Sequence, residues 1–199
     1  MTGKQLTRVL AGTPEHLREL HDRLVAAADA ESILDLAYRT VDTPLGALLL
    51  AATETGLVKV AYAGQDHDMV LEQLAAAISP RLLRAPARLY APARQIEEYF
   101  ARRRISFDLP LDFRLAHGFR RRVLAALRNV GYGTTASYAT LAAAAGSPKA
   151  YRAAGSACAA NPLPIVVPCH RAVRGDGTPG RYIGGVEAKR TLLALEATA

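Results

Sequence analysis

The stretch of this chain best suited to chemistry runs Asn161-Pro162-Leu163-Pro164-Ile165-Val166-Val167-Pro168-Cys169-His170-Arg171. Its aliphatic residues predict a buried extended segment, and Pro168 restricts the backbone that presents Cys169. An imidazole or a nearby cation lowers the pKa of a thiol, so Cys169 beside His170 is a candidate nucleophile. The alternative is that Cys169 serves only as a small apolar side chain. Because neighbours on an extended strand point to opposite faces, His170 is expected to act through a turn or a bridging water.

The remaining cysteine and the histidines argue against a metal centre. Cys158 and Cys169 are the chain's two cysteines, too few for a disulfide framework or a four-cysteine zinc site. The five histidines are scattered without metal-ligand spacing. We therefore expect no metal and no cofactor.

No apolar run reaches the roughly 18 residues of a transmembrane helix. The N-terminal residues 1–5 lack the apolar core of a signal peptide, so a cytoplasmic protein without membrane contact is expected.

Positive charge is concentrated in the second half of the chain, whose total net charge is +7. Residues 1–109 contain 13 Lys and Arg against 14 Asp and Glu, whereas residues 110–199 contain 12 against 4. A basic half joined to a neutral half indicates that the second half meets a polyanion. Surface charge can also serve solubility alone.

The order of elements predicts an α+β chain in three parts. Residues 1–32 form a helical extension, in which Thr13 caps a helix with Pro14 at its first position. Residues 33–110 form an α/β domain and residues 111–199 a helical domain. The α/β domain begins with a small antiparallel meander of short apolar strands separated by turns, at Leu36–Val41, Ala47–Ala52 and Leu57–Ala63. Helical patterns at 67–79 and 91–104 follow, then an extended piece at 105–109 and a linker at 110–116.

The helical domain has the pattern of a helix-turn-helix. A helix over 119–130 is followed by Ser137, which caps a second helix from Tyr138 to Ala145. A third helix is predicted to begin with Ser147 as its N-cap and Pro148 at its first position, and to run to Ala160.

This third helix is poor in side chains that could recognise base edges. After Arg152 it contains only alanine, glycine, serine and one cysteine, so it cannot specify a DNA sequence through the major groove. Small residues permit close backbone approach, which is typical of minor-groove proteins that insert one side chain at a base step. A tightly packed internal helix would have the same composition.

The motifs together resemble the O6-alkylguanine-DNA alkyltransferase family, also called methylated-DNA–protein-cysteine methyltransferases. The resemblance covers about residues 35–196. It rests on Asn161-Pro162, Pro168-Cys169-His170-Arg171 and Tyr182-Ile183-Gly184-Gly185, with Thr43-Pro44-Leu45-Gly46, Ser137-Tyr138, Lys189 and Leu192-Leu193-Ala194-Leu195-Glu196. It implies a ribonuclease-H-like roll followed by a winged helix-turn-helix catalytic domain.

The resemblance also implies a role for each matching residue. Cys169 would accept the alkyl group, His170 would take its proton through a water, and Glu196 would orient the histidine. Asn161 would connect the third helix, which would be the DNA-recognition helix, to the segment that carries Cys169. Tyr138 would help neutralise the departing guanine at N3. Further substrate contacts are implied for Tyr182, Ile183, Gly184, Lys189, Val167 and Pro168. Arg152 would replace the extruded nucleotide, and the other implied DNA contacts are Ser137, Tyr151, Ala153, Gly155 and Ser156.

The implied reaction is irreversible alkyl transfer from O6-alkylguanine, and from O4-alkylthymine, in double-stranded DNA to Cys169. A stable thioether implies one turnover by a monomer bound in the minor groove without sequence preference. Two residues depart from the family pattern: Ile183 stands where a small residue such as serine could donate a hydrogen bond, and Leu124 where an aromatic is common. The zinc site of some relatives needs N-terminal cysteines that this chain lacks.

Three other functions are consistent with parts of the sequence. A silent relative that senses alkylated DNA would have lost the cysteine, which is present here. A winged-helix transcription regulator would need base-reading side chains on residues 149–160. A Cys-His thiol hydrolase would turn over many times and ignore DNA.

Overall fold

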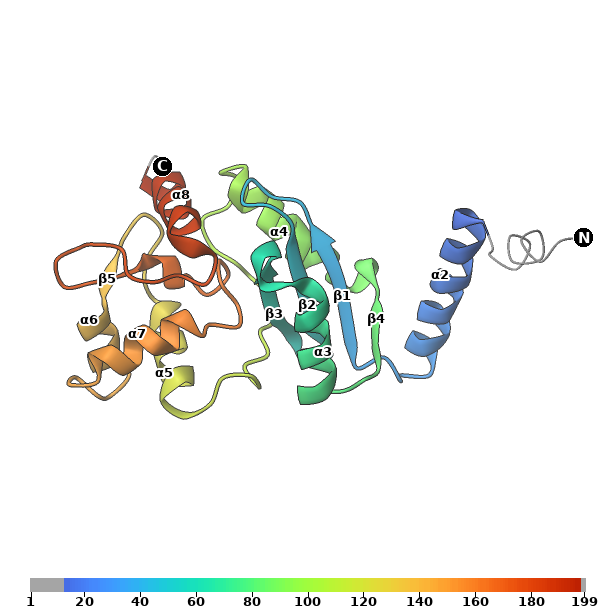
Figure 1. Cartoon of the computed structure of the whole chain (residues 1–199), viewed down its shortest axis with the longest axis horizontal. Coiled ribbons are helices and arrows are strands. Elements are labelled where there is room, and N and C mark those ends of the chain that lie inside the picture. The colour runs from blue at the N-terminus through green and yellow to red at the C-terminus, as the bar shows by residue number, and fades with distance from the viewer. Residues whose placement is uncertain (1–12, 198–199) are drawn as a thin grey trace, which may run out of the picture.

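The computed structural model describes residues 13–197, arranged as an N-terminal helix, a sheet domain and a helical domain (Figure 1). The N-terminal helix is α2 (Pro14–Ala30), whose N-cap Thr13 accepts a hydrogen bond from the backbone N–H of His16 and whose Ala28 packs in the core of the sheet domain. This confirms the predicted cap and the proline at the first helical position. Residues 1–5, on which the expectation of no signal peptide rests, lie outside the described residues.

The sheet has four strands in the order β3-β2-β1-β4. The predicted antiparallel meander is confirmed as β1 (Leu36–Val41), β2 (Leu48–Thr53) and β3 (Gly56–Tyr62). The sheet is nevertheless mixed, because β4 (Leu82–Arg84) pairs in parallel with β1. Strand β4 was not predicted, because its three residues show no apolar alternation.

Two helices bury the two faces of the sheet. Val70 and Leu74 of α3 (His67–Ala77) pack on one face, and Ile96 and Tyr99 of α4 (Tyr90–Phe100) belong to the larger core on the other. Burial on both sides explains why β2 is continuously apolar rather than alternating. Short 3-10 turns at Ala63–Gln65 and Pro86–Leu89 precede the helices. The extended piece expected at 105–109 forms no regular strand.

The helical domain contains α5 (Gly118–Leu127), α6 (Tyr138–Ala144), α7 (Tyr151–Ala159) and α8 (Gly185–Ala197). A two-stranded parallel sheet joins β5 (Ala136–Ser137) to β6 (Ala172–Val173). Ser137 caps α6 as predicted, accepting from the backbone N–H of Thr140 at 3.0 Å.

The predicted start of the third helix is wrong. α7 begins at Tyr151 with Ala150 as its N-cap. The carbonyl of Ser147 instead accepts from the N–H of Ala150 at 2.9 Å, which closes a turn around Pro148. Both residues suit a turn as well as a helix start, and the turn prevails here.

Strand β3 joins the two domains. Its Leu57 N–H donates to the carbonyl of Pro110 in the linker, and its Val60 N–H donates to the carbonyl of Pro162 at 2.8 Å. Gly56 permits the first contact, because a Cβ on this residue would lie 2.2 Å from the Pro110 oxygen. The segment that leads to Cys169 is thus attached to the sheet. No helix within residues 13–197 is long and apolar enough to cross a membrane.

Candidate functional site

Cys169 begins a 3-10 turn, Cys169–Arg171, and is buried at 2% exposure. The segment before it is buried as predicted, but it is a series of turns rather than extended. Ile165 has a φ of +72°, a conformation that β-branched residues rarely adopt. The N–H of Cys169 bonds the carbonyl of Val167 at 2.8 Å. In this turn Cys169 and His170 are not bound to opposite faces, as they would be on a strand.

The side chain of Asn161 holds this turn together. Its Oδ1 accepts from the N–H of Leu163 at 3.0 Å, and its Nδ2 donates to the carbonyl of Val167 at 2.8 Å and to the Cys169 sulfur at 3.1 Å. Asn161 is fully buried directly after α7. It therefore connects the end of that helix to the thiol, and its N–H stabilises a negative sulfur.

A buried carboxylate, Glu196 on α8, lies behind the cysteine turn. Its oxygens accept hydrogen bonds from His170 Nε2 at 2.8 Å, from Arg171 Nε and Nη2 at 2.9 Å each, from the Tyr99 hydroxyl at 2.7 Å and from the Gly133 N–H at 3.3 Å. Although burial acts to raise the pKa of Glu196, the bonds from His170 and Arg171 lower it to about 2. Glu196 is therefore charged at neutral pH.

The charge on Glu196 determines which ring nitrogen of His170 carries a proton. A carboxylate can only accept, so the Nε2 that contacts it must carry a proton. Burial lowers the pKa of His170, so the ring is neutral at pH 7 and its Nδ1 has a free lone pair. This Nδ1 is buried and has no hydrogen-bond partner among the described residues. His170 is thus arranged as a base.

The thiol has a high pKa at rest. Burial raises the pKa of Cys169 to about 11, while the Asn161 bond and the nearby Lys189 oppose the shift. Lys189 is fully buried and donates from Nζ to the carbonyl of Ala172. Burial raises the pKa of the other buried cysteine, Cys158, to about 12. Cys169 is therefore protonated at pH 7 and needs a base to react as a thiolate.

The loop before α8 lies against the same site. The Tyr182 ring is buried and meets the His170 ring edge-on, with centroids 6.3 Å apart. Ile183 is half-buried and packs on the apolar core. Gly185 has a φ of +88°, and its N–H bonds the carbonyl of Tyr182 at 3.0 Å, which closes a tight turn. Pro168 and Val167 are buried beside Cys169.

A groove of about 830 Å³ runs between α6, α7 and the 174–181 loop. Tyr138 is half-buried and lines this groove, and Gly180 lies so close that a Cβ there would be 2.2 Å from the Tyr138 hydroxyl. Burial raises the pKa of Tyr138, which keeps the hydroxyl a donor. The residues that line the groove combine small side chains with three arginines and two tyrosines. They are Tyr138, Ala139, Tyr151, Arg152, Gly155, Ser156, Ala159, Arg174, Gly175, Gly180 and Arg181.

Of the residues expected to contact DNA, four line this groove: Tyr151, Arg152, Gly155 and Ser156. Arg152 and Tyr151 are exposed at the start of α7, with the guanidinium 5.6 Å from the tyrosine ring centroid. Ala153 is also exposed, but it does not line the groove. The hydroxyl of Ser137 caps α6.

Three residues at the site were not predicted from the sequence. Arg171 stands in the quoted motif, yet its pairing with Glu196 joins residues 25 positions apart. Tyr99 on α4 and Tyr62 on β3 come from the sheet domain, and both reach the helical domain through their hydroxyls. Nothing local in the sequence distinguishes them from ordinary core tyrosines. Within residues 13–197, no group of three potential metal ligands occurs.

Comparison with known proteins gives a consistent result over most of the chain. Residues 36–113 match the family model described as 6-O-methylguanine DNA methyltransferase, ribonuclease-like domain, and residues 118–198 match the DNA binding domain of the same family.

The chain is 38% identical over 161 residues to the methylated-DNA–protein-cysteine methyltransferase of Mycolicibacterium paratuberculosis, covering 81% of this chain and 92% of that protein. It is 40% identical over 168 residues to the bifunctional transcriptional activator/DNA repair enzyme Ada of Escherichia coli, but this covers 46% of Ada and 82% of this chain. Among solved structures, Mycobacterium tuberculosis OGT in complex with DNA aligns with a TM-score of 0.70 and 34% identity, over 81% of this chain and 93% of that one.

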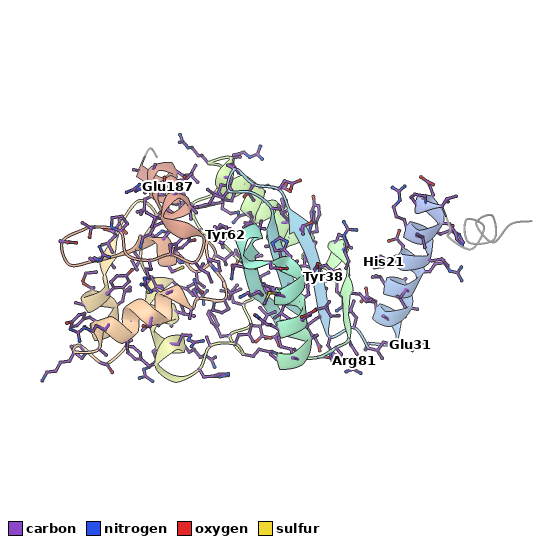
Figure 2. All side chains as sticks on the ribbon, in the orientation of Figure 1. His21, Glu31, Tyr38, Tyr62, Arg81 and Glu187 are labelled. Atoms are coloured by element: carbon purple, nitrogen blue, oxygen red, sulfur yellow. The ribbon has the colours of Figure 1, made fainter. Side chains whose placement is uncertain are left out.

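Glu196 and its hydrogen-bond partners are expected to make the unfolding free energy of the protein depend on pH. The pKa of Glu196 lies near 2 in the folded protein against 4.5 ordinarily, so its contribution is complete above pH 4.5 and is lost as the pH falls toward 2. The difference corresponds to about 3 kcal/mol of unfolding free energy. In urea unfolding, Glu196→Gln should lack this part of the acid dependence. Glu187→Gln, on an exposed position of α8 (Figure 2), should retain it. Equal acid dependence in all three proteins would contradict the network.

Proposed function

This chain belongs to the 6-O-methylguanine DNA methyltransferase family and repairs DNA by transferring an alkyl group to one of its own cysteines, and we propose that the acceptor is Cys169. The observation that carries the proposal is a pair of hydrogen bonds on neighbouring residues: Asn161 donates to the Cys169 sulfur, and His170, the next residue, is held by Glu196. Cys158 is also buried, but it lies in the last turn of α7, and no base among the described residues forms a hydrogen bond with its thiol.

Proton removal from Cys169 falls to His170. The free Nδ1 takes the thiol proton through one water, and the imidazolium that forms is stabilised by the charged Glu196. Arg171 and Tyr99 hold the carboxylate in place, so the histidine keeps its orientation. Asn161 Nδ2 stabilises the thiolate.

The thiolate then displaces guanine from the alkyl carbon. A sulfur–carbon bond forms as the bond between that carbon and O6 breaks, and the guanine ring takes the electron pair. A proton donated to the ring, with Tyr138 as the neighbouring donor, restores neutral guanine. The thioether is stable and no group at the site reverses it. Each molecule therefore repairs one lesion, on O6-alkylguanine and O4-alkylthymine alike.

The protein binds DNA through the α6–α7 groove. Arg152, Arg174 and Arg181 line it and supply positive charge, while the small residues of α7 permit close approach to a backbone. Such a surface fits the minor groove without reading sequence. Arg152, exposed at the start of α7, fills the space of the extruded base. The protein acts on DNA as a monomer.

The acceptor assignment predicts stoichiometric self-alkylation. Mixing the protein with excess O6-methylguanine duplex should add one methyl group per chain, at Cys169, as measured by mass spectrometry of the intact protein and its peptides. Cys158→Ala should behave as the parent, whereas Cys169→Ala should bind the duplex and acquire no methyl group. Sustained turnover beyond one equivalent would instead indicate a thiol hydrolase, and methyl on Cys158 would refute the assignment.

The role of Arg152 predicts a loss confined to duplex substrates. Extrusion of a base costs a few kcal/mol, so Arg152→Ala should slow repair of duplex O6-methylguanine by about tenfold or more. Reaction with the free base O6-benzylguanine should stay within about twofold, because no base is extruded. Arg18→Ala on α2, at the opposite end of the molecule (Figure 1), controls for lost charge. Equal losses on both substrates would show that Arg152 does not serve extrusion.

A further inference from the structure

Tyr62, the last residue of β3, is a sheet-domain residue that touches the loop before α8. Figure 2 shows it on the side of the sheet that faces the helical domain, whereas Tyr38 lies on β1, farther toward α2. The Tyr62 hydroxyl is 2.9 Å from the Tyr182 hydroxyl, and both side chains are buried. Their rings meet edge to face with centroids 5.9 Å apart. The pair therefore joins residues 120 positions apart across the domain boundary.

The same tyrosine ring fills the space beside Gly184. A Cβ on Gly184 would lie 2.7 Å from Cε2 and from Cζ of Tyr62 and 2.9 Å from Cε1. The backbone of Gly184 thus rests directly on the ring. Tyr62 holds the loop at two points, through the hydroxyl of Tyr182 and through contact with Gly184. Ile183 lies between these two points.

The Tyr182–Gly185 loop, which Tyr62 contacts, is part of the candidate site. Tyr182 meets the His170 ring, and His170 directly follows Cys169. Burial raises the pKa values of Tyr62 and Tyr182, and a negative charge on Cys169 would add to the rise. We propose that Tyr62 is a positioning residue that sets how closely the Tyr182–Gly185 loop approaches Cys169, and thereby limits the size of the alkyl group that is transferred. This inference rests on the proposed function.

The physical reason is that the position of the loop determines the width of the space beside the sulfur. With the Tyr62 ring in place, the loop cannot move toward the sheet because Gly184 is already in contact with it. Without the ring, the loop can move into the vacated volume, which widens the space. A methyl group would then be held less precisely, while a benzyl group would gain room. Displacement of about 1 Å suffices to slow a transfer reaction strongly.

The test compares methyl and benzyl transfer to Cys169 in Tyr62→Leu, Tyr62→Phe and the control Tyr38→Leu. Single-turnover rates are measured with O6-methylguanine and O6-benzylguanine oligonucleotides, and thermal unfolding verifies folding. Tyr62→Leu should slow methyl transfer about tenfold and benzyl transfer less than about threefold, so the benzyl-to-methyl ratio rises. Tyr62→Phe, which retains the ring, should change the ratio less than about twofold. Tyr38→Leu should leave the ratio unchanged.

A second substitution tests the contact between Gly184 and the Tyr62 ring. Gly184→Ala alone should slow both transfers, because its Cβ needs the space that the ring occupies. In the double variant with Tyr62→Leu, the alanine should be tolerated and the rates should return to those of Tyr62→Leu. If Tyr62→Leu lowers both rates equally, or if Gly184→Ala costs the same in both backgrounds, Tyr62 is only a core residue and the inference is wrong. Failure of the parent to methylate Cys169 would instead refute the proposed function.

Discussion

The site depends on one buried negative charge. A carboxylate removed from water is costly unless its lone pairs are satisfied, and Glu196 is 2% exposed. Two charge-assisted bonds from Arg171, one from His170, one from the Tyr99 hydroxyl and one from a backbone N–H compensate for this cost. Because this carboxylate remains charged, the proton of His170 is kept on Nε2, and the other ring nitrogen keeps a free lone pair for the proposed role as a base.

That arrangement requires both domains. Arg171 and His170 belong to the cysteine turn, Glu196 belongs to α8, and Tyr99 belongs to α4 of the sheet domain. Strand β3 adds a backbone bond to Pro162, and Tyr62 at its end contacts the loop before α8. The sheet domain therefore supports the candidate site directly, rather than only preceding it along the chain.

The sequence predicted the parts of this structure that local patterns determine. The three-strand meander, the Thr13 and Ser137 caps and the motif around Cys169 were all identifiable from spacing or from family resemblance. Strand β4 was missed because three residues carry no periodicity. The start of α7 was misplaced because Ser147-Pro148 suits a turn equally well. The segment before Cys169 was mistaken for an extended one because its turns depend on the Asn161 side chain. Arg171, Tyr99 and Tyr62 could not be assigned, since their partners lie 25, 97 and 120 positions away.

The most direct test of the central claim is the pH dependence of transfer from free O6-benzylguanine to Cys169. The neutral thiol–imidazole pair and the thiolate–imidazolium pair bind the same number of protons. The parent rate should therefore be nearly flat from about pH 7 to 9, between the lowered pKa of His170 and the pKa of about 11 of Cys169. In His170→Ala the thiolate must form by losing its proton to solvent, so the rate should rise about tenfold per pH unit over the same range. A parent rate that itself rises tenfold per unit would show that His170, held by Glu196, is not the base.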